Sequence, residues 1–434
     1  MSAVKVIGAG LAGSEAAWQL AQRGLQVQLY EMKPEKKSPA HHTDTFAELV
    51  CSNSFRGDRL ENAVGLLKEE LRRLDSLIMA CADATRVEAG GCLAVDRQGF
   101  SDLVTQKISS HPNITVISEE VTQVPEGPVI IATGPLTSDA MSEAIGAYFG
   151  SDYLHFFDAV APLVTAESID MDKAWWQSRY DRGTPDYINC AMDKAEYEAF
   201  LQALITAEAA EVHGFEDNRV FEGCMPVEVM GRRGPDTLRF GPLKPVGLTD
   251  PKTGKEPYAV VQLRQDNAAK SVFNLVGFQT HLKVPEQKRV FSMIPALRNA
   301  EFVRYGVMHR NTFLQSPKLL DRYYADRRNP LVAFAGQMTG VEGYVESTAS
   351  GYLAAVAMAA RLQDRPLPEF TRETAVGALG LYISDSQIEG FQPMNINFSI
   401  IASLEQRIRK KAEKNLAIAN RSLAIIDALR EKGI

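Results

Sequence analysis

Two short apolar runs separated by a helical segment open the chain. Residues 3–7 (Ala-Val-Lys-Val-Ile) and 26–30 (Gln-Val-Gln-Leu-Tyr) are rich in strand-forming residues, and the segment that starts near Ser14 has the spacing of a helix. The order strand, helix, strand predicts a parallel βαβ unit at this end of the chain.

Three glycines lie in the turn between the first strand and the helix, in the run Gly8-Ala9-Gly10-Leu11-Ala12-Gly13. Gly8 turns the strand sharply, Gly10 lets the backbone approach a pyrophosphate, and Gly13 lets the helix pack closely on the strand. The helix N-terminus then favours the pyrophosphate anion. Glu31, eighteen residues past Gly13, is placed to accept hydrogen bonds from an adenosine ribose, and its charge would repel a 2′-phosphate. This pattern predicts bound FAD or NAD rather than NADP.

Further along, apolar residues predict one amphipathic helix and one buried strand. An apolar face recurs at helical spacing, with Lys68, Glu69, Glu70, Arg72 and Arg73 opposite; it comprises Leu60, Val64, Leu67, Leu71, Leu74 and Ile78. Residues 129–132 read as a buried strand that ends at Thr133-Gly134-Pro135, where the chain is expected to return to the nucleotide. No second G-x-G-x-x-G follows, which favours a single dinucleotide, FAD.

The pattern changes in the middle of the chain and changes back near residue 331. Short strands at 259–263 and 271–276, separated by Pro- and Gly-rich turns, predict an inserted mixed α/β domain. The strand 331–334 then enters A-G-Q-M-T-G-V-E-G-Y-V-E, where Gly336, Gln337 and Gly340 are expected to approach the cofactor. An alanine-rich helix at 350–362 and an amphipathic helix at about 400–430 follow, the latter with Leu404, Ile408, Leu416, Leu423, Ile426 and Leu429 facing inward.

These patterns predict an α/β protein with a Rossmann-like FAD-binding domain in two parts, residues 1–150 and 331–434, around an inserted substrate domain, residues 151–330. The second part ends in the basic amphipathic helix. With 434 residues the chain is long enough for two or three cores. No stretch of eighteen apolar residues and no signal peptide is visible, so we expect a soluble cytoplasmic protein without a membrane partner.

The net charge of −7 by itself counts against a nucleic-acid partner. The charge is uneven, however, because residues 401–434 carry eight basic and four acidic side chains. Basic residues are usually solvated surface, but a basic face built from several clusters is an open alternative.

Two of the five cysteines are predicted to lie on loops. Cys51 ends an apolar run in L-V-C-S-N-S-F-R, and Cys224 stands between glycine and proline in F-E-G-C-M-P-V-E. Cys81, Cys92 and Cys190 are interpreted as small buried hydrophobes. The odd number and the lack of C-x-x-C argue against disulfides and zinc, and the seven histidines show no metal motif.

On these motifs the chain resembles the folate- and FAD-dependent tRNA uracil-5-methyltransferase family, TrmFO, previously called Gid. The resemblance covers essentially the whole chain and includes R-F-G-P-L-K-P-V-G-L at 239–248 and A-G-Q-M-T-G-V-E-G-Y from Ala335. Gln337 departs from flavoproteins at large, where an acid usually follows A-G. The related MnmG-type wobble-uridine enzymes share this glutamine, but they are much longer.

The resemblance implies a chemistry for the loop thiols. The cysteine matching Cys224 would add to uracil C6, and the one matching Cys51 would remove the C5 proton or assist carbon transfer. 5,10-Methylenetetrahydrofolate would supply the carbon, FAD the electrons, and NADH or NADPH would reduce the flavin. A histidine would stack on the folate, His281 being the first choice and His309 the second. The substrate would be the T-loop uridine at position 54 of tRNA.

Three alternatives to this methyltransferase are open from the residues alone. One is an FAD oxidoreductase acting on a small molecule. Another is an MnmG-like enzyme that modifies the wobble uridine. The third is a flavin-bound tRNA-binding protein without catalysis.

Overall fold

The structure is a computed structural model of the chain. It describes residues 3–38, 40–150, 154–159, 161–210, 225–306, 308–388 and 391–433, and of residues 154–159 and 308–312 the backbone alone. Cys224 therefore lies outside the described residues.

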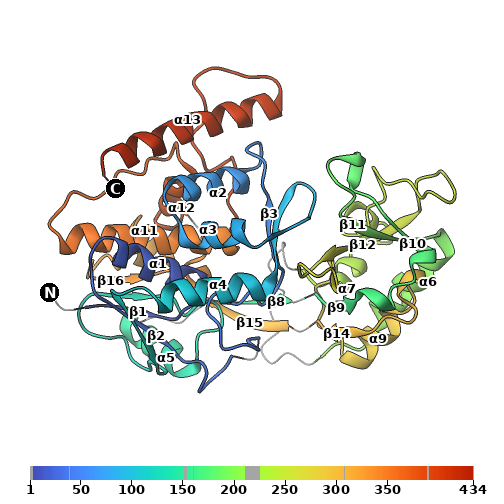
Figure 1. Ribbon diagram of the computed structural model, residues 1–434, viewed down its shortest axis with the longest axis horizontal. Helices are drawn as coiled ribbons and strands as arrows, with labels where there is room; N and C mark the ends of the chain where they lie inside the picture. Colours follow the sequence, from blue (N-terminus) through green and yellow to red (C-terminus); the bar gives the residue numbers. More distant parts are fainter. Residues whose placement is uncertain are drawn as a thin grey trace.

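A five-stranded parallel sheet forms the centre of the larger lobe (Figure 1). Its strands, in spatial order, are β16 (Val332–Phe334), β7 (Val129–Ile131), β1 (Val4–Ile7), β2 (Val27–Glu31) and β6 (Ile114–Ser118), and every neighbouring pair is parallel. Strands from both ends of the sequence thus share one sheet. The predicted βαβ unit and the buried strand after residue 128 are confirmed.

Two helices pack tightly against each other beside this sheet. Helix α1 (Leu11–Gln22) begins at Leu11, three residues earlier than predicted, and α11 (Tyr344–Leu362) begins six residues before the predicted alanine-rich stretch. A Cβ atom built on Gly351 of α11 would lie 2.2 Å from the carbonyl oxygen of Ala12. Small residues in both helices therefore permit a backbone approach that larger side chains would prevent.

A six-stranded sheet forms the second lobe, from residues that lie between β7 and β16 in sequence. Its order is β10 (Ala174–Trp176), β11 (Tyr187–Met192), β12 (Ala259–Gln265), β13 (Val272–Leu275), β9 (Leu163–Thr165) and β14 (Phe302–Arg304), with antiparallel pairing throughout. Its core includes residues of α6 (Lys194–Thr206), α7 (Val227–Arg232) and α9 (Val284–Phe291). The predicted α/β class with a second, mixed unit is confirmed.

Other elements complete the two lobes. The antiparallel pair β8 (Leu154–Ala159) and β15 (Met308–Phe313) lies where the chain leaves and re-enters the larger lobe (Figure 1). The remaining longer elements are β3 (Ser54–Gly57), β4 (Arg86–Val87), β5 (Cys92–Val95), α4 (Arg97–Ser109), α5 (Asp139–Phe149), α8 (Thr237–Phe240), α10 (Ser316–Leu319) and α12 (Ala375–Ile383). No helix in the described ranges is long and apolar enough to cross a membrane.

The single helix predicted over 60–78 is wrong. The chain forms α2 (Ala63–Arg73) and α3 (Leu77–Ala84), because Asp75 takes a φ of 55° and the Ser76 hydroxyl caps α3 by accepting from the Met79 N–H. Two charged residues assigned to the solvent face are also fully buried, Lys68 and Glu70. The helical spacing of apolar residues continues from α2 into α3 because both helices pack on the same core.

The buried charges of α2 have specific partners. Lys68 Nζ donates to the carbonyl oxygens of Phe55 (2.9 Å) and Gly57 (2.7 Å), and Glu70 accepts from the backbone N–H groups of Ala375 (2.7 Å) and Val376 (2.8 Å). These long-range contacts offset the cost of burying a charge, which a sequence pattern cannot show.

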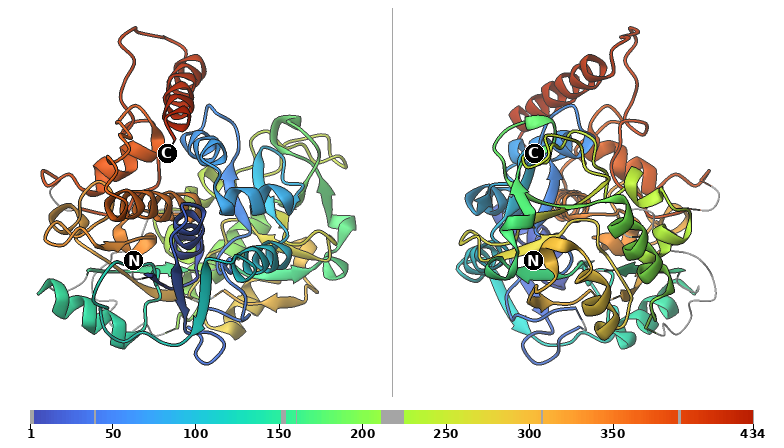
Figure 2. Two further views of the ribbon diagram at one scale, coloured as in Figure 1. Left: turned by 60° about the vertical axis from the view of Figure 1, so that its left-hand side comes forward. Right: turned by 90° about the vertical axis from the view of Figure 1, so that its right-hand side faces the viewer.

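The last helix is shorter than predicted. Helix α13 (Lys411–Glu431) begins eleven residues after residue 400 and lies beside α2, as both views in Figure 2 show. Leu423, Ile426 and Leu429 are buried as expected, whereas Leu416 is exposed. Leu404 and Ile408 precede the helix and lie in the loop that leads into it.

Candidate active site

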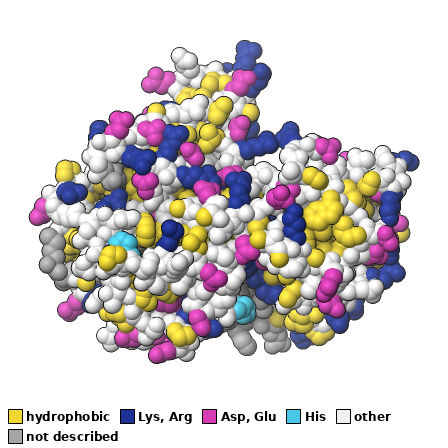
Figure 3. All heavy atoms as spheres, viewed as in Figure 1, with side chains coloured by type: hydrophobic (Ala, Val, Ile, Leu, Met, Phe, Trp, Pro, Cys, Tyr) yellow, Lys and Arg dark blue, Asp and Glu magenta, His cyan; other side chains and the backbone are white. Residues whose placement is uncertain are grey.

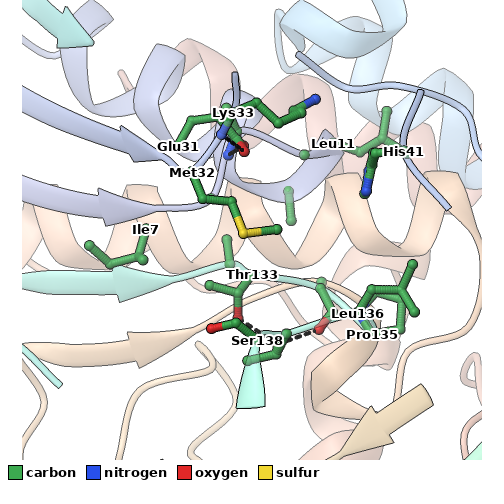
Figure 4. Close-up of a pocket in the computed structure, with 18 of the residues that line it drawn as sticks. Ile7, Leu11, Glu31, Met32, Lys33, His41, Thr133, Pro135, Leu136 and Ser138 are labelled. Carbon is green, nitrogen blue, oxygen red and sulfur yellow. Dashed lines mark hydrogen bonds between the residues drawn. The ribbon is translucent and has the colours of Figure 1, made fainter. Parts of the chain in front are cut away.

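A cavity opens at the carboxyl ends of β1, β2, β7 and β16. In Figure 4, Glu31 at the end of β2 and Met32 and Lys33 after it face Thr133, Pro135 and Ser138 after β7 across the cavity. Ligands of open α/β sheets bind at this edge. Most of the predicted cofactor residues line the cavity: Gly8, Ala9, Gly10, Leu11, Ala12, Glu31, Gly134, Gly336 and Gln337. Gly13 and Gly340 are not among its lining residues.

The three positions of the first turn require glycine for different structural reasons. Gly8 has a φ of 96°, and its Cβ would lie 2.7 Å from the Ala132 carbonyl oxygen; a Cβ on Gly13 would lie 1.8 Å from the Gly8 carbonyl oxygen. Both positions exclude a side chain by packing within the protein. A Cβ on Gly10 would meet no protein atom within 4 Å, and Gly10 lines the cavity. Space at Gly10 is therefore left for a ligand.

The N-terminus of α1 points its unpaired backbone donors at this space. Gly10 is the N-cap residue, and no side chain caps the helix. The N–H groups of the first turn and the positive end of the helix dipole thus face the cavity, which suits an anion such as a pyrophosphate.

The carboxylate of Glu31 is buried and holds the glycine turn. Its Oε2 accepts from the Ala9 N–H (2.9 Å), and its Oε1 accepts from the Lys33 N–H (3.1 Å). Each oxygen has a second lone pair, so both can also accept from a ligand hydroxyl. The sequence indicated the ligand role of this acid, but not its role in fixing the turn.

Two basic side chains at the cavity were missed by the sequence analysis. Lys33 and His41 line it, in the segment that follows β2. Lys33 Nζ donates to the Thr45 carbonyl oxygen, and the His41 ring Nδ1 lies 2.6 Å from the Ser38 hydroxyl. Burial lowers the pKa of both groups, and the Lys33 charge lowers the pKa of His41 further. No local motif marks these two residues.

Gln337 and Gly340 follow β16 and have different surroundings. Gln337 Nε2 donates to both carboxylate oxygens of Glu342, at 2.8 and 2.7 Å. Gly340 has a φ of 85°, and its Cβ would lie 2.4 Å from the Phe391 ring. Packing against that ring accounts for this glycine without a ligand.

The loop that carries Cys51 lies directly beside the cavity, where Val50 is a lining residue. The Tyr344 hydroxyl accepts from the backbone N–H groups of Cys51 and Ser52, both at 3.1 Å, and Arg304 Nη2 donates to the Cys51 carbonyl oxygen at 3.1 Å. Tyr344 also lines the cavity, whereas Arg304 belongs to β14 of the second lobe. The two lobes therefore hold this loop from opposite sides.

Further arginines extend this anchorage. Arg97 forms a buried ion pair with Asp266 (2.8 Å) and donates to the Leu49 carbonyl oxygen, while Arg264 donates to the Ser52 hydroxyl at 2.6 Å. The Arg97 and Arg304 guanidinium groups both interact electrostatically with the Cys51 thiol. Nearby cations stabilise a thiolate, the reactive form of cysteine.

The segments that flank Cys224 pack around His281. Val227 N donates to the Gln279 carbonyl oxygen (2.7 Å), and Ala210 N donates to the His281 carbonyl oxygen (2.8 Å). The His281 ring Nδ1 lies 2.5 Å from the buried Glu228 carboxylate, which also accepts from the His281 backbone N–H at 2.9 Å. The chain before and after Cys224 thus meets at this histidine.

The other predicted residues are placed as follows. The backbone of His309 in β15 pairs with Asp158 of β8, and its side chain lies outside the described residues. Burial raises the pKa of the Cys81 and Cys190 thiols to about 12, so both are unreactive as expected, and Cys92 is half-buried. Within the described ranges no cluster of His, Cys, Asp or Glu could hold a metal.

Comparisons with known proteins decide the family. A family profile described as glucose inhibited division protein A (GIDA) matches residues 3–366. A protein of Acetivibrio thermocellus named methylenetetrahydrofolate–tRNA-(uracil-5-)-methyltransferase TrmFO is 62% identical over 98% of this chain and 97% of its own. One of the same name from Listeria monocytogenes is 58% identical over 99% of both chains. The chain belongs to the TrmFO family.

The solved structures place TrmFO on the same fold as a longer protein. GidA from Aquifex aeolicus, in two crystal forms, matches with TM-scores of 0.72 and 0.73 at 15% identity. These matches cover 99% of this chain but only 73% and 75% of the GidA chains. The 15% identity shows a shared fold alone, and the resemblance drawn from the motifs is confirmed by the family profile and the TrmFO relatives.

Proposed function

We propose that this TrmFO chain transfers a one-carbon unit from 5,10-methylenetetrahydrofolate to C5 of a uridine in tRNA. The identity of about 60% over nearly the whole chain to proteins that carry this name is the observation that supports the proposal. In finer detail, we propose the T-loop uridine at tRNA position 54 as the target, FAD as the bound cofactor and NADH or NADPH as its reductant. A tRNA substrate implies a cytoplasmic enzyme.

The cavity fits FAD by three observations. No side chain caps the N-terminus of α1. The absence of a side chain at Gly10 leaves space for a ligand, and Glu31 has lone pairs that can accept from a ribose hydroxyl. We assign the pyrophosphate to the turn 8–13, the ribose to Glu31, and the rest of the cofactor to the side of Gly134 and Gly336. When bound, reduced FAD supplies the two electrons that bring the transferred carbon to the methyl level.

The two loop thiols supply the remaining chemistry in this proposal. The thiolate of Cys224 adds to uracil C6, which moves electron density to C5 and makes C5 the nucleophile toward the folate methylene carbon. Cys51 takes the proton that C5 must lose as the bond between the methylene carbon and the folate nitrogen breaks and tetrahydrofolate leaves. With the two electrons that a bound reduced flavin would supply to the transferred carbon, the Cys224–C6 bond then breaks to restore the ring. The anchorage of the Cys51 loop by Tyr344 and Arg304 supports a fixed position for that thiol.

We keep His281 as the first choice for stacking on the folate and His309 as the second. The position of His281 between the chain segments that flank Cys224 supports this order, because folate carbon and activated uracil must meet. We also propose that residues 151–330 act as the substrate domain and that residues 1–150 and 331–434 hold the flavin.

The test is mass spectrometry of an unmodified tRNA transcript incubated with the enzyme, methylenetetrahydrofolate and NADPH. The wild-type enzyme should form 5-methyluridine, whereas Cys224→Ala should form none while keeping its flavin absorbance. Cys92→Ala, a half-buried cysteine outside the site, is the matched control and should retain activity. An active Cys224→Ala enzyme would remove the nucleophile assignment, and NADPH oxidation without any change in the tRNA would favour a small-molecule oxidoreductase.

A further inference from the structure

A second hollow shares no lining residue with the candidate cofactor cavity, and we call it the basic groove. It is formed by β3 and the start of α2, by the loop 396–399, and by the residues that lead into α13. Five basic side chains and one acidic side chain line it: Arg56, Arg407, Arg409, Lys411, Lys414 and Glu61. This balance stands out in a chain whose net charge is −7.

The basic residues at the start of α13 destabilise this helix. Positive side chains are unfavourable at a helix N-terminus, where the helix dipole is itself positive. Yet α13 begins with Lys411 after N-cap Lys410, has no side-chain cap, and has Glu413 as its one first-turn acid, which pairs with Lys410 at 2.9 Å. Figure 3 shows Lys and Arg side chains gathered at this tip of the molecule. A bound anion would relieve both the missing cap and the repulsion.

Two kinds of group in the groove suit a phosphate: backbone N–H groups at helix N-termini and basic side chains without a carboxylate partner. The N-terminus of α2 lies at its wall, where N-cap Asn62 makes no side-chain capping bond. Within the described part of the chain, Arg407, Arg409, Lys411 and Lys414 have no carboxylate partner. Arg56 differs, because its guanidinium pairs with the buried Glu346. Four exposed cations and two helix N-termini thus remain for a ligand.

The groove is linked to the Cys51 loop through two short segments. Arg56 follows Cys51 by five residues, and its partner Glu346 lies two residues after Tyr344, which holds the Cys51 backbone. Glu346 also accepts from the Ile396 N–H (2.9 Å) at the groove wall. Direct contacts therefore connect the groove wall to the loop that carries Cys51.

From this arrangement we propose that the basic groove binds consecutive backbone phosphates of the tRNA substrate. The inference rests on the proposed function for the identity of the RNA, and it locates a contact that no motif indicates. Phosphate contacts of this kind position the nucleic acid without reading its sequence. The groove then holds the RNA backbone while the target base enters the site beside Cys51.

The test compares two double variants of the holoenzyme that remove the same charge from residues at or next to the two ends of α13. Arg409→Gln/Lys411→Gln alters the groove, and Arg430→Gln/Lys432→Gln alters the far end of α13. Binding of a fluorescent unmodified tRNA transcript is measured by anisotropy between 50 and 300 mM KCl. Each lost phosphate contact lowers the slope of log K against log salt by about 0.7–0.9. The groove variant should therefore lose about 1.4–1.8 units of slope and bind roughly 25- to 60-fold more weakly at 0.1 M salt.

The control variant should bind like the wild type. Equal weakening in both variants, or an unchanged slope in the groove variant, would overturn the proposal. A raised KM for NADPH with unchanged tRNA binding would instead assign the groove to a nucleotide phosphate, which also overturns it. Because binding is measured without turnover, a wild-type enzyme that binds tRNA but forms no 5-methyluridine would refute the proposed function and leave the groove result separate.

Discussion

Replacement of Gly10 by alanine should separate ligand binding from folding in the glycine turn. Gly10 has φ −71° and ψ −170°, which any L-residue adopts, and a Cβ there meets no protein atom within 4 Å. The apoprotein should therefore lose little stability, about 0.5–1 kcal/mol from a poorer N-cap residue. The new methyl group would project into the space that we assign to the pyrophosphate.

The loss in FAD affinity follows from the contacts that the methyl group would displace. A hydrogen bond from a backbone N–H to a charged oxygen contributes about 1.5–3 kcal/mol. If the substitution displaces two of them, binding weakens by about 3–6 kcal/mol, or roughly 10²- to 10⁴-fold at 1.4 kcal/mol per factor of ten. The assay is titration of flavin-free protein with FAD by fluorescence quenching, together with urea unfolding of the same apoprotein.

Gly13→Ala is the matched comparison in the same turn. Its Cβ would lie 1.8 Å from the Gly8 carbonyl oxygen, so the backbone of the turn must move even without ligand. Overpacking of this kind costs about 1–3 kcal/mol. Gly13→Ala should thus destabilise the apoprotein more than Gly10→Ala does. Wild-type FAD affinity in Gly10→Ala, or equal destabilisation of the two apoproteins, would refute the reasoning.

Two further substitutions probe the Cys51 loop and a buried carboxyl group. Tyr344→Phe leaves two backbone N–H groups without their acceptor, at about 1–3 kcal/mol each, so kcat for methylation should fall at least about 10-fold. Tyr382→Phe, which loses one exposed hydrogen bond, is the control, and equal kcat values for the two variants would contradict the anchoring role of Tyr344. Burial raises the pKa of Glu70 from 4.5 to about 7, so the native state binds an extra proton between these values. The free energy of unfolding should therefore fall by about 3 kcal/mol as the pH rises from 4.5 to 7 and then level off. Urea unfolding across this range should show a flatter dependence for Glu70→Gln, and an unchanged slope would rule out Glu70 as its source.

The nucleotide turn could be predicted from sequence because its determinants are local. Gly13 packs on the Gly8 carbonyl group and Glu31 accepts from the Ala9 N–H, so both act within one βαβ unit, whereas Gly8 packs against Ala132 after β7. The same holds for β7 and β16, whose continuous apolar runs reflect burial on both faces. Fold class and the candidate cofactor edge were therefore accessible from residue order.

Helix boundaries and buried charges depended on distant contacts. The face from Leu60 to Ile78 kept one period across the break at Asp75, because α2 and α3 share a core. Lys68 and Glu70 have the polarity of solvated residues, yet both are buried. A backbone carbonyl of β3 accepts from Lys68, and a backbone N–H of α12 donates to Glu70. Local polarity cannot reveal a partner that is three hundred residues away.

The surroundings of the reactive loop and the basic groove were decided by tertiary structure alone. Cys51 could be recognised by its motif, but Tyr344 and Arg304 reach it from separate lobes, 293 and 253 residues along the chain. Likewise, Arg56 and the residues before α13 form one groove only because α13 packs on α2. Residue order specifies which chemical groups are present, whereas long-range packing selects which of them meet.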